Sequence, residues 1–443
     1  MDSAQRNSGA TIIRARVAHT PGDPFRESGA LATFDDGAVA FADGLILATG
    51  PFAQVAAAHP TADIHDRRDC FLFPGLVDTH VHYPQIPVIG SMGLQLLDWL
   101  ATRTLPEEAK MADPAHARRA AQRFVRLLAA NGTTSALVFG SHFPAAQEAL
   151  FEEAEAIGLR VASGLVVSDR NLRPELEVTP EVAYQASREL RERWHGRGRL
   201  RYCVTPRFSV SCSEAMLEAC RALLEEAPSV LFTSHVNESP GEIAFVRELF
   251  PAARDYLGTY EDAGLLRERS VLAHNVHVSD DELARLAAAH VAVAHCPSSN
   301  AFLASGIFPM GRHVEHGVRF GMGTDVGAGT GLSMLKEGLV SYHLQMVRDQ
   351  GHMLGPAHLL YLATAAGADA LGLGDVCGDF TPGKAADLVL LRPPAGSTLA
   401  AVLEDAPSWE AALGAIFTLA REESVLEVRV AGDVVFSREE QRP

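Results

Sequence analysis

The sequence is poor in several features that mark specialised classes of protein. Only six cysteines occur among 443 residues, with no Cys-x-x-Cys pair, so neither a disulfide framework nor a cysteine-rich zinc site is indicated. Lys and Arg total 38 against 55 Asp and Glu, and the resulting charge of −17 argues against nucleic acid as a partner. No stretch approaches the roughly 20 apolar residues of a membrane span. We therefore expect a cytoplasmic protein with a small, uncharged substrate and no membrane partner.

What is present is ordinary globular composition. Hydrophobic residues make up 47% and charged residues 21% of the chain, which excludes a disordered or fibrous protein. A single hydrophobic core rarely grows beyond about 250 to 300 residues, so a chain of this length predicts a large domain with a smaller second one.

The middle of the chain alternates between short apolar runs and helical segments. Eight runs rich in β-branched residues predict strands, and they are Leu76–His82, Ser135–Gly140, Val161–Val167, Arg201–Pro206, Val230–Val236, Val271–His277, Val291–Pro297 and Arg319–Asp325. The segments between them that predict helices include Pro114–Ala130, Ala145–Ile157, Pro180–Trp194, Ser213–Glu226 and Asp280–Ala289. Eight strands alternating with helices predict an α/β fold of the (β/α)8 TIM-barrel type, which we assign to residues 75–379.

A doubly wound open sheet is the alternative arrangement of such elements. It predicts fewer strands and a glycine-rich phosphate loop after the first strand. No Gly-x-Gly-x-x-Gly follows the first run, and Gly321, Gly323 and Gly327 surround the last run with the wrong spacing. The barrel is favoured, and a dinucleotide cofactor is not indicated.

The two ends of the chain have a different pattern, in which short strands flank tight turns. Asp43-Gly44 separates two alternating runs near the N-terminus, and Gly432-Asp433 does so near the C-terminus. Because the barrel lies between them, we expect residues 1–74 and 380–443 to pair into one small β-sandwich domain.

Side chains able to bind a metal recur at the predicted carboxyl ends of the strands, where barrels place their catalytic groups. His80 and His82 end the first run, and residues two apart in a strand face the same side. His235, His274 and Asp325 belong to the fifth, sixth and eighth runs. A chain with 18 histidines places some of them at strand ends by chance, but this joint pattern is hard to obtain in that way.

Several histidines with one aspartate suit zinc, with iron and manganese as lesser alternatives. One position must stay open for water, whose pKa a bound metal lowers to about 7. Asp325 can accept the proton of that water, and His274 is expected to orient it rather than to bind the metal.

Glu238 lies three residues beyond His235, just past the end of a strand. A carboxylate at that point can carry protons to a ring nitrogen and then to a leaving amine. The alternative is a solvent-exposed glutamate at the start of a helix, where acidic residues are favoured. Beside the metal-binding set, the catalytic interpretation is preferred.

These residues resemble the amidohydrolase superfamily, and within it the guanine deaminase family, over nearly the full chain. The resemblance is carried by the segments 74–85, 96–100, 131–134, 205–208, 234–238, 296–300, 323–329 and 382–387. His-x-His, Gly-Thr-Asp and Pro-Gly-Lys-x-Ala-Asp are common to the superfamily, whereas His-Tyr-Pro-Gln and Pro-Arg-Phe are more specific.

The resemblance implies a homodimer of the purine salvage or catabolic route that hydrolyses guanine to xanthine and ammonia. It implies one zinc ion bound by His80, His82, His235 and Asp325, with His274 orienting the hydroxide or binding as an additional ligand. It carries Glu238 over as the proton shuttle. The substrate contacts that it implies are Gln85, Arg207 and Phe208.

Elementary chemistry agrees with these contacts. Arg207 suits the paired O6 and N7 acceptors of guanine, Phe208 can stack on the purine, and Gln85 offers both a donor and an acceptor. A surface ion pair is the alternative for Arg207.

Two other functions remain open. An amidohydrolase that deaminates another purine or pyrimidine, or that deaminates or dechlorinates a triazine, would keep the same metal site, because only the pocket residues differ. A non-catalytic metal-binding protein is the second, but it would be expected to lack part of the metal and carboxylate set, which is complete here. A barrel alone does not decide function.

Overall fold

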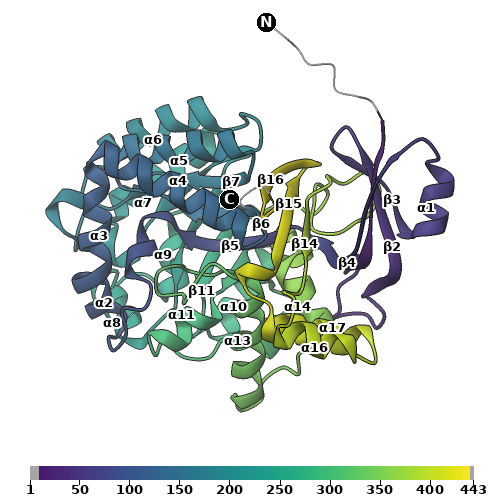
Figure 1. Cartoon of the computed structure of the whole chain (residues 1–443). Helices are drawn as coiled ribbons and strands as arrows, with labels where there is room; N and C mark the ends of the chain where they lie inside the picture. The colour runs from purple at the N-terminus through teal and green to yellow at the C-terminus, as the bar shows by residue number, and fades with distance from the viewer. Residues whose placement is uncertain (1–8, 440–443) are drawn as a thin grey trace, which may run out of the picture.

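The computed structural model describes residues 9–439, which form a parallel barrel beside a second sheet (Figure 1). The barrel strands follow one another around the sheet in chain order. They are β5 (Leu76–His82), β6 (Thr133–Phe139), β7 (Arg160–Gly164), β9 (Leu200–Pro206), β10 (Leu231–Val236), β11 (Ser270–His274), β12 (Ala292–His295) and β13 (Arg319–Met322), with the short β8 (Val166–Val167) also paired to β9. The predicted (β/α)8 barrel is confirmed.

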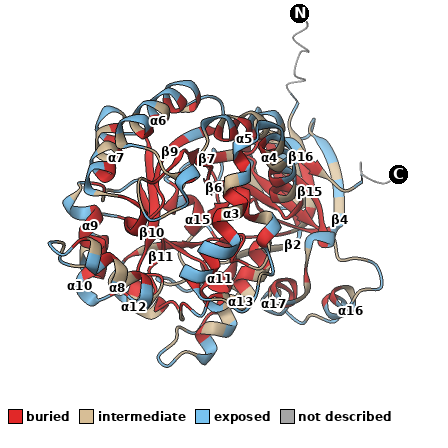
Figure 2. Ribbon diagram, turned by 90° about the vertical axis from the view of Figure 1, so that its left-hand side faces the viewer, coloured by how far each residue is buried: buried red, intermediate tan, exposed pale blue. Residues whose placement is uncertain are grey.

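Helices lie between these strands and cover the outside of the barrel, so that the strands are buried and the outer helix faces exposed (Figure 2). The first helices are α2 (Leu96–Trp99), α3 (Leu105–Ala109), α4 (Pro114–Ala130), α5 (Pro144–Ile157), α6 (Pro180–Trp194), α7 (Glu214–Glu226), α8 (Pro240–Leu249) and α9 (Tyr256–Asp262). The later ones between barrel strands are α10 (Asp280–Ala288), α11 (Pro297–Phe302) and α12 (Met310–Glu315). After the last barrel strand come α13 (Met334–Val347), α14 (Pro356–Ala363) and α15 (Ala365–Ala370), and α16 (Thr398–Glu404) and α17 (Trp409–Leu419) lie between β14 (Leu388–Leu391) and β15 (Val425–Val430) of the second sheet.

Local sequence explains where several of these helices begin. Ser239 and Ser279 each accept the backbone N–H three residues on, while the glutamate at that position bonds back to the serine. This reciprocal capping satisfies two N–H groups that the helix itself leaves unpaired.

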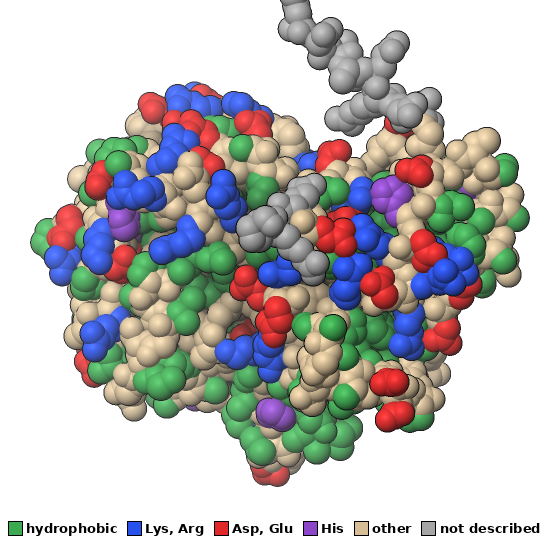
Figure 3. Space-filling model, in the orientation of Figure 1, with side chains coloured by type: hydrophobic (Ala, Val, Ile, Leu, Met, Phe, Trp, Pro, Cys, Tyr) green, Lys and Arg blue, Asp and Glu red, His purple; other side chains and the backbone are tan. Residues whose placement is uncertain are grey.

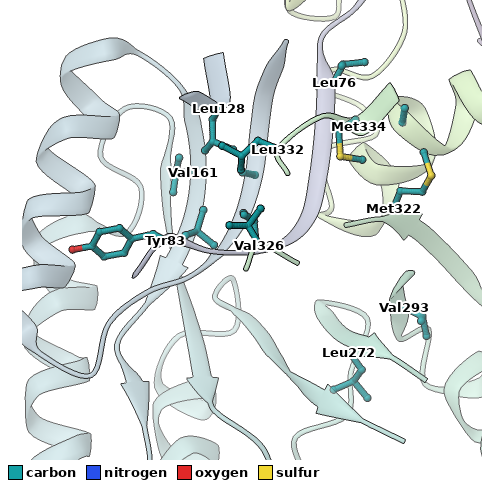
Figure 4. Packing of buried hydrophobic residues seen from close by; sticks show 14 of the residues in the cluster. Leu76, Tyr83, Leu128, Val161, Leu272, Val293, Met322, Val326, Leu332 and Met334 are labelled. Atoms are coloured by element: carbon teal, nitrogen blue, oxygen red, sulfur yellow. The ribbon is translucent and has the colours of Figure 1, made fainter. Parts of the chain in front are cut away.

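Side chains of the strands alternate between two hydrophobic clusters. Leu272 of β11 and Val293 of β12 point outward and share a cluster with Leu128 of α4 (Figure 4). Their neighbours Val271 and Ala292 belong to a separate cluster inside the barrel. This period of two is the pattern from which the strands were predicted.

The first and last strands of the barrel meet through hydrogen bonds at their carboxyl ends. Thr79 Oγ1 donates to the carbonyl oxygen of Met322 at 2.8 Å, and the N–H of Asp325 donates to the carbonyl oxygen of His80 at 2.8 Å. A Cβ at Gly323 would lie only 2.8 Å from Cβ of His80, so the approach requires glycine there. Asp325 is thereby held directly beside His80.

The last three barrel strands are shorter than the apolar runs that predicted them. The runs Val271–His277, Val291–Pro297 and Arg319–Asp325 continue two or three residues beyond β11, β12 and β13. The backbone leaves the extended conformation at these points, with φ of +75° at His274 and +48° at Asp325. The ends of the runs therefore form the rim of the barrel.

Both ends of the chain contribute to one seven-stranded sheet, in the order β16-β15-β14-β4-β1-β2-β3. Its strands are β1 (Thr11–His19), β2 (Ala32–Ala42), β3 (Leu45–Pro51), β4 (Asp63–Pro74), β14 (Leu388–Leu391), β15 (Val425–Val430) and β16 (Asp433–Ser437), and α1 (Phe52–Ala58) follows β3. The expected pairing of the two termini is confirmed. The boundaries 1–74, 75–379 and 380–443 stay a proposal, and residues 1–8 and 440–443 lie outside the described part.

An ion pair joins the second sheet to the barrel. Arg160, the first residue of β7, donates from Nε to Oδ2 of Asp387 at 2.6 Å, just before β14. The side chain of Asp387 also accepts the N–H of Ala431, so one carboxylate ties a barrel strand to the C-terminal hairpin.

The surface carries charges of both signs, and the face in Figure 3 shows Lys and Arg interspersed with Asp and Glu. Within residues 9–439, no helix combines the length and the apolar character needed to cross a bilayer. All six cysteines are buried and free of disulfide bonds.

Candidate active site

Four histidines and one aspartate converge at the carboxyl end of the barrel. Nε2 of His82 lies 3.2 Å from Nε2 of His80 and 3.3 Å from Nε2 of His235. Oδ1 of Asp325 lies 3.2 Å from Nε2 of both His80 and His82, and its Oδ2 is 3.9 Å from Nε2 of His274. The structure thus brings together side chains from β5, β10 and β11 and from the loop after β13.

Hydrogen bonds on the far side of two rings fix how those rings point. His235 donates from Nδ1 to the carbonyl oxygen of Arg207 at 2.6 Å, and His274 donates from Nδ1 to Oδ1 of Asn300 at 2.9 Å. With the proton on Nδ1, Nε2 of each ring keeps its lone pair and faces the centre of the cluster.

The donor set fits a metal ion. Burial lowers the pKa of His82 to about 4 and that of His235 well below its ordinary value, so both rings are neutral at pH 7. Burial opposes the charge of Asp325, but hydrogen bonds from His80 and His82 hold the pKa of its carboxyl well below the usual range. Ring nitrogens this close together satisfy one another poorly through hydrogen bonds, whereas one cation can satisfy them all.

The backbone at the site is strained. His274 and Asp325 both have positive φ, which costs free energy for residues other than glycine. Asn237 and Asn275, which follow the ends of β10 and β11, adopt the same conformation, which asparagine tolerates better. Strained residues gathered at one rim are typical of a functional site.

Glu238 lies next to this cluster. Its Oε2 is 3.4 Å from Nε2 of His274, and its Oε1 accepts a hydrogen bond from Oγ of Ser305 at 3.0 Å. Burial, reinforced by the charge of Asp325, raises the pKa of Glu238 to about 8. Burial therefore favours the protonated carboxyl group, the form that can donate a proton to a substrate.

A small cavity, of about 30 Å³, lies beside the cluster. Gln85, Arg207 and Phe208, the substrate contacts that the family resemblance implies, all line it. The residues that complete its wall are His82, Leu96, Trp99, Leu100, His235, Glu238, His274, Leu303, Asp325 and Ala328.

Sequence reasoning missed three supporting residues. Asp78 accepts the N–H and the hydroxyl of Thr324 at 3.0 and 2.6 Å, which links β5 to the residue before Asp325. Asn300 holds His274, and Glu108 bonds to Arg207 behind the cavity wall. Asp78 and Asn300 lie in two of the segments that carry the family resemblance, 74–85 and 296–300. Asp78 is also two residues from His80, so both residues could have been proposed from the sequence. Glu108 does not follow a predicted strand and lies in none of the recognised motifs, so nothing in the sequence pointed to its role.

Comparison with known proteins agrees with this geometry. The amidohydrolase family model matches residues 71–435, and the bacterial imidazolonepropionase-like composite domain matches residues 37–62. A probable guanine deaminase of Deinococcus radiodurans is 57% identical over 97% of this chain and 99% of its own length. The guanine deaminase of Escherichia coli is 38% identical over 95% of this chain and 96% of its own length.

The solved structure of the E. coli enzyme superposes with a TM-score of 0.94 at 36% identity, covering 97% of this chain and all of that one. This superposition covers both the barrel and the second sheet. The family model also includes strands of both, since it runs from β4 to β16. The chain belongs to the amidohydrolase family, in the branch that contains the guanine deaminases.

Proposed function

We propose that this chain hydrolyses guanine to xanthine and ammonia in purine catabolism, with one zinc ion at the histidine cluster. The observation that carries the proposal is a single cavity lined by His82, His235, His274 and Asp325 of the metal-binding cluster, by Glu238 and by three side chains suited to a purine. The relatives that match nearly the full chain bear the name guanine deaminase.

Recognition of the purine falls to Arg207, Gln85 and Phe208. Both bonds from Arg207 to Glu108 use Nη1, so Nε and Nη2 remain for paired acceptors such as O6 and N7 of guanine. Phe208 offers a flat ring for stacking, and Gln85 has donor and acceptor capacity left on its amide.

The metal would be held by His80, His82, His235 and Asp325, with His274 close enough to serve as an additional ligand. Zinc bound there would lower the pKa of a coordinated water to about 7 and so supply hydroxide near neutral pH.

Three side chains handle the protons of the reaction. Asp325 accepts the proton of the attacking water, and the fixed ring of His274 orients that water. Burial raises the pKa of Glu238 to about 8, which favours the protonated form that can donate to a ring nitrogen. The carboxylate left behind can then take the proton of the new hydroxyl group on the ring carbon and pass it to the leaving amine, while the proton held by Asp325 restores the acid.

Turnover of guanine by zinc-loaded protein tests the proposal, with xanthine and ammonia both measured. The panel run beside it contains adenine, cytosine, 8-oxoguanine and triazines. The Glu238→Gln variant keeps the shape of the side chain but cannot shuttle a proton, so we expect guanine turnover to fall by about 10²- to 10⁴-fold. Zinc bound without guanine turnover would move the assignment to the amine that is consumed.

The Arg207→Ala variant tests the purine contact separately. It removes a buried guanidinium that faces the cavity, so kcat/KM for guanine should fall sharply while zinc content is retained. Unchanged guanine turnover would overturn the assigned role of Arg207.

We further propose that the protein acts in the cytoplasm as a homodimer, in keeping with its family. Light scattering after size-exclusion chromatography tests the assembly, and a mass near the 47.4 kDa of one chain would contradict it.

A further inference from the structure

Glu108 lies behind the wall of the cavity rather than in it. It is carried by α3, its side chain is buried, and only 3% of the residue is exposed. Both of its carboxylate oxygens accept bonds from Nη1 of Arg207, at 2.8 and 2.7 Å, and Oε1 also accepts Nε2 of Gln85 at 2.7 Å. One carboxylate thus holds the two polar side chains assigned to the substrate.

The amide of Gln85 is fixed at both ends. Its Nε2 donates to Glu108, and its Oε1 accepts the N–H of Gly327 at 3.0 Å. The orientation of the amide, and hence which group it offers to the cavity, follows from the acceptor at Glu108.

The charges behind the cavity wall balance. Burial opposes ionisation of Glu108, but the guanidinium of Arg207 holds the pKa of the carboxyl well below its ordinary value. His142 lies with Nε2 3.5 Å from Oε2 of Glu108, and burial lowers the pKa of this ring, which favours its neutral form. Arg207 therefore presents N–H donors to the cavity without an uncompensated positive charge.

Glu108 also anchors the segment that covers the cavity. Leu96, Trp99 and Leu100 line the cavity and lie in the stretch of chain that leads into α3. The bond from Arg207, which follows β9, ties the end of this stretch to the barrel.

We propose that Glu108 is a positioning residue that orients Arg207 and Gln85 and makes the cavity select an uncharged purine over an anionic one. The inference rests on the proposed function and adds a determinant of specificity to the same site. An anion beside an unpaired buried guanidinium would gain a favourable ionic contact, whereas beside the neutral pair it gains little and loses its hydration.

The Glu108→Gln variant tests this role through two measurements, the kinetic constants for guanine and the inhibition by urate. A purely structural role of Glu108 would not raise KM while leaving kcat nearly unchanged, nor would it strengthen inhibition by an anion. Loss of orientation weakens binding in the ground state and the transition state alike, so KM for guanine should rise about tenfold or more while kcat changes less than about threefold. Urate, an anionic purine with oxygen at C2, C6 and C8, should inhibit the variant at least about tenfold more strongly than the parent protein. Unchanged KM and unchanged urate inhibition would overturn the proposal.

Two further variants serve as controls. Glu107→Gln changes the neighbouring glutamate, which pairs with Lys110 and does not line the cavity, and should leave KM and urate inhibition as they are. The double variant Glu108→Gln/Arg207→Gln removes both charges, so urate should lose the advantage that it gains in the single variant. A gain that persists in the double variant would contradict the charge argument.

If Glu108→Gln does not fold, as judged by its melting temperature and zinc content, Glu108→Asp replaces it. The shorter side chain keeps the charge but cannot reach Arg207 and Gln85 together, so KM should rise while urate stays excluded. Unchanged KM in Glu108→Asp would overturn the positioning role. If the parent protein consumes another base instead of guanine, the assigned substrate fails, and the same variants are compared with that base.

Discussion

Asn300 holds the ring of His274 across the rim of the barrel. Nδ1 of His274 donates to Oδ1 of Asn300 at 2.9 Å, and both side chains are buried. The bond fixes the tautomer in which Nε2 faces the site, 3.4 Å from Oε2 of Glu238. A residue that does not line the cavity thus decides which nitrogen of His274 is available.

The Asn300→Ala variant should lose this control. We expect kcat/KM to fall by about 10- to 100-fold, the effect typical of removing a group that orients a metal-site histidine. Asn300→Asp keeps an acceptor at the same place and should retain more activity. Asn131→Ala, which removes a bond to a helix carbonyl instead, is the matched control. Equal kcat/KM in Asn300→Ala and the parent protein would contradict the role.

Phe208 should contribute to binding through its flat ring. Leucine fills much of the same volume but cannot stack, so Phe208→Leu should raise KM for guanine by about tenfold, in keeping with stacking worth about 1 to 3 kcal/mol. Phe250→Leu changes a phenylalanine that does not line the cavity and controls for core packing. KM for guanine is measured by steady-state kinetics, and an unaltered KM for Phe208→Leu would exclude stacking of Phe208 on the substrate.

Removal of the metal should destabilise the barrel, because the facing nitrogens of His80, His82 and His235 lose their common partner. Zinc at 100 times its Kd stabilises by about 2.7 kcal/mol, so a chelator should lower Tm and added zinc restore it. In Asp325→Ala this response to zinc should shrink, whereas His343→Ala, on the exposed face of α13, should keep it. A Tm that changes with neither the chelator nor added zinc would argue against a metal site at this cluster.

Stability should fall with acid through His19, the last residue of β1 in the second sheet. Burial lowers the pKa of His19 from 6.5 to about 4, and its Nδ1 accepts the N–H of Phe380, a bond that needs the neutral ring. The unfolded chain binds this proton at higher pH than the folded one. The contribution is therefore complete above pH 6.5 and is lost as pH falls toward 4, by at most about 3 kcal/mol.

The His19→Asn variant isolates this effect, because an amide oxygen can accept the same N–H but does not titrate. Denaturant unfolding at several pH values should show the difference between variant and parent changing between pH 6.5 and 4. The contributions of the other buried histidines to the pH dependence are the same in both proteins and cancel in that difference. A difference that stays constant over this range would show that His19 does not couple folding to pH.

Much of the barrel could be predicted because its signals are local. The apolar run over Leu76–His82 coincides with β5, and the helical segment Pro114–Ala130 coincides with α4. Each element has its own periodicity and its own stop residues, so no knowledge of distant contacts is needed. The ends of β11 and β13 were predicted too late, since the backbone turns at His274 and Asp325 are imposed by the site.

The metal cluster was accessible from sequence for a related reason. A barrel brings the carboxyl ends of all its strands to one rim, so a residue at a strand end can be placed without coordinates. His80, His82, His235, His274 and Asp325 meet as that rule predicts.

What the sequence determined by itself was therefore the order of strands and helices, the pairing of the two termini and the residues that face the rim. Only the tertiary structure decided how those residues are held. Glu108 reaches Arg207 across 99 positions of the chain, and Asn300 reaches His274 across 26. Such contacts depend on how separate elements pack. They produce no periodic pattern in the sequence, because a single buried carboxylate or amide does not repeat at the spacing of a helix or a strand.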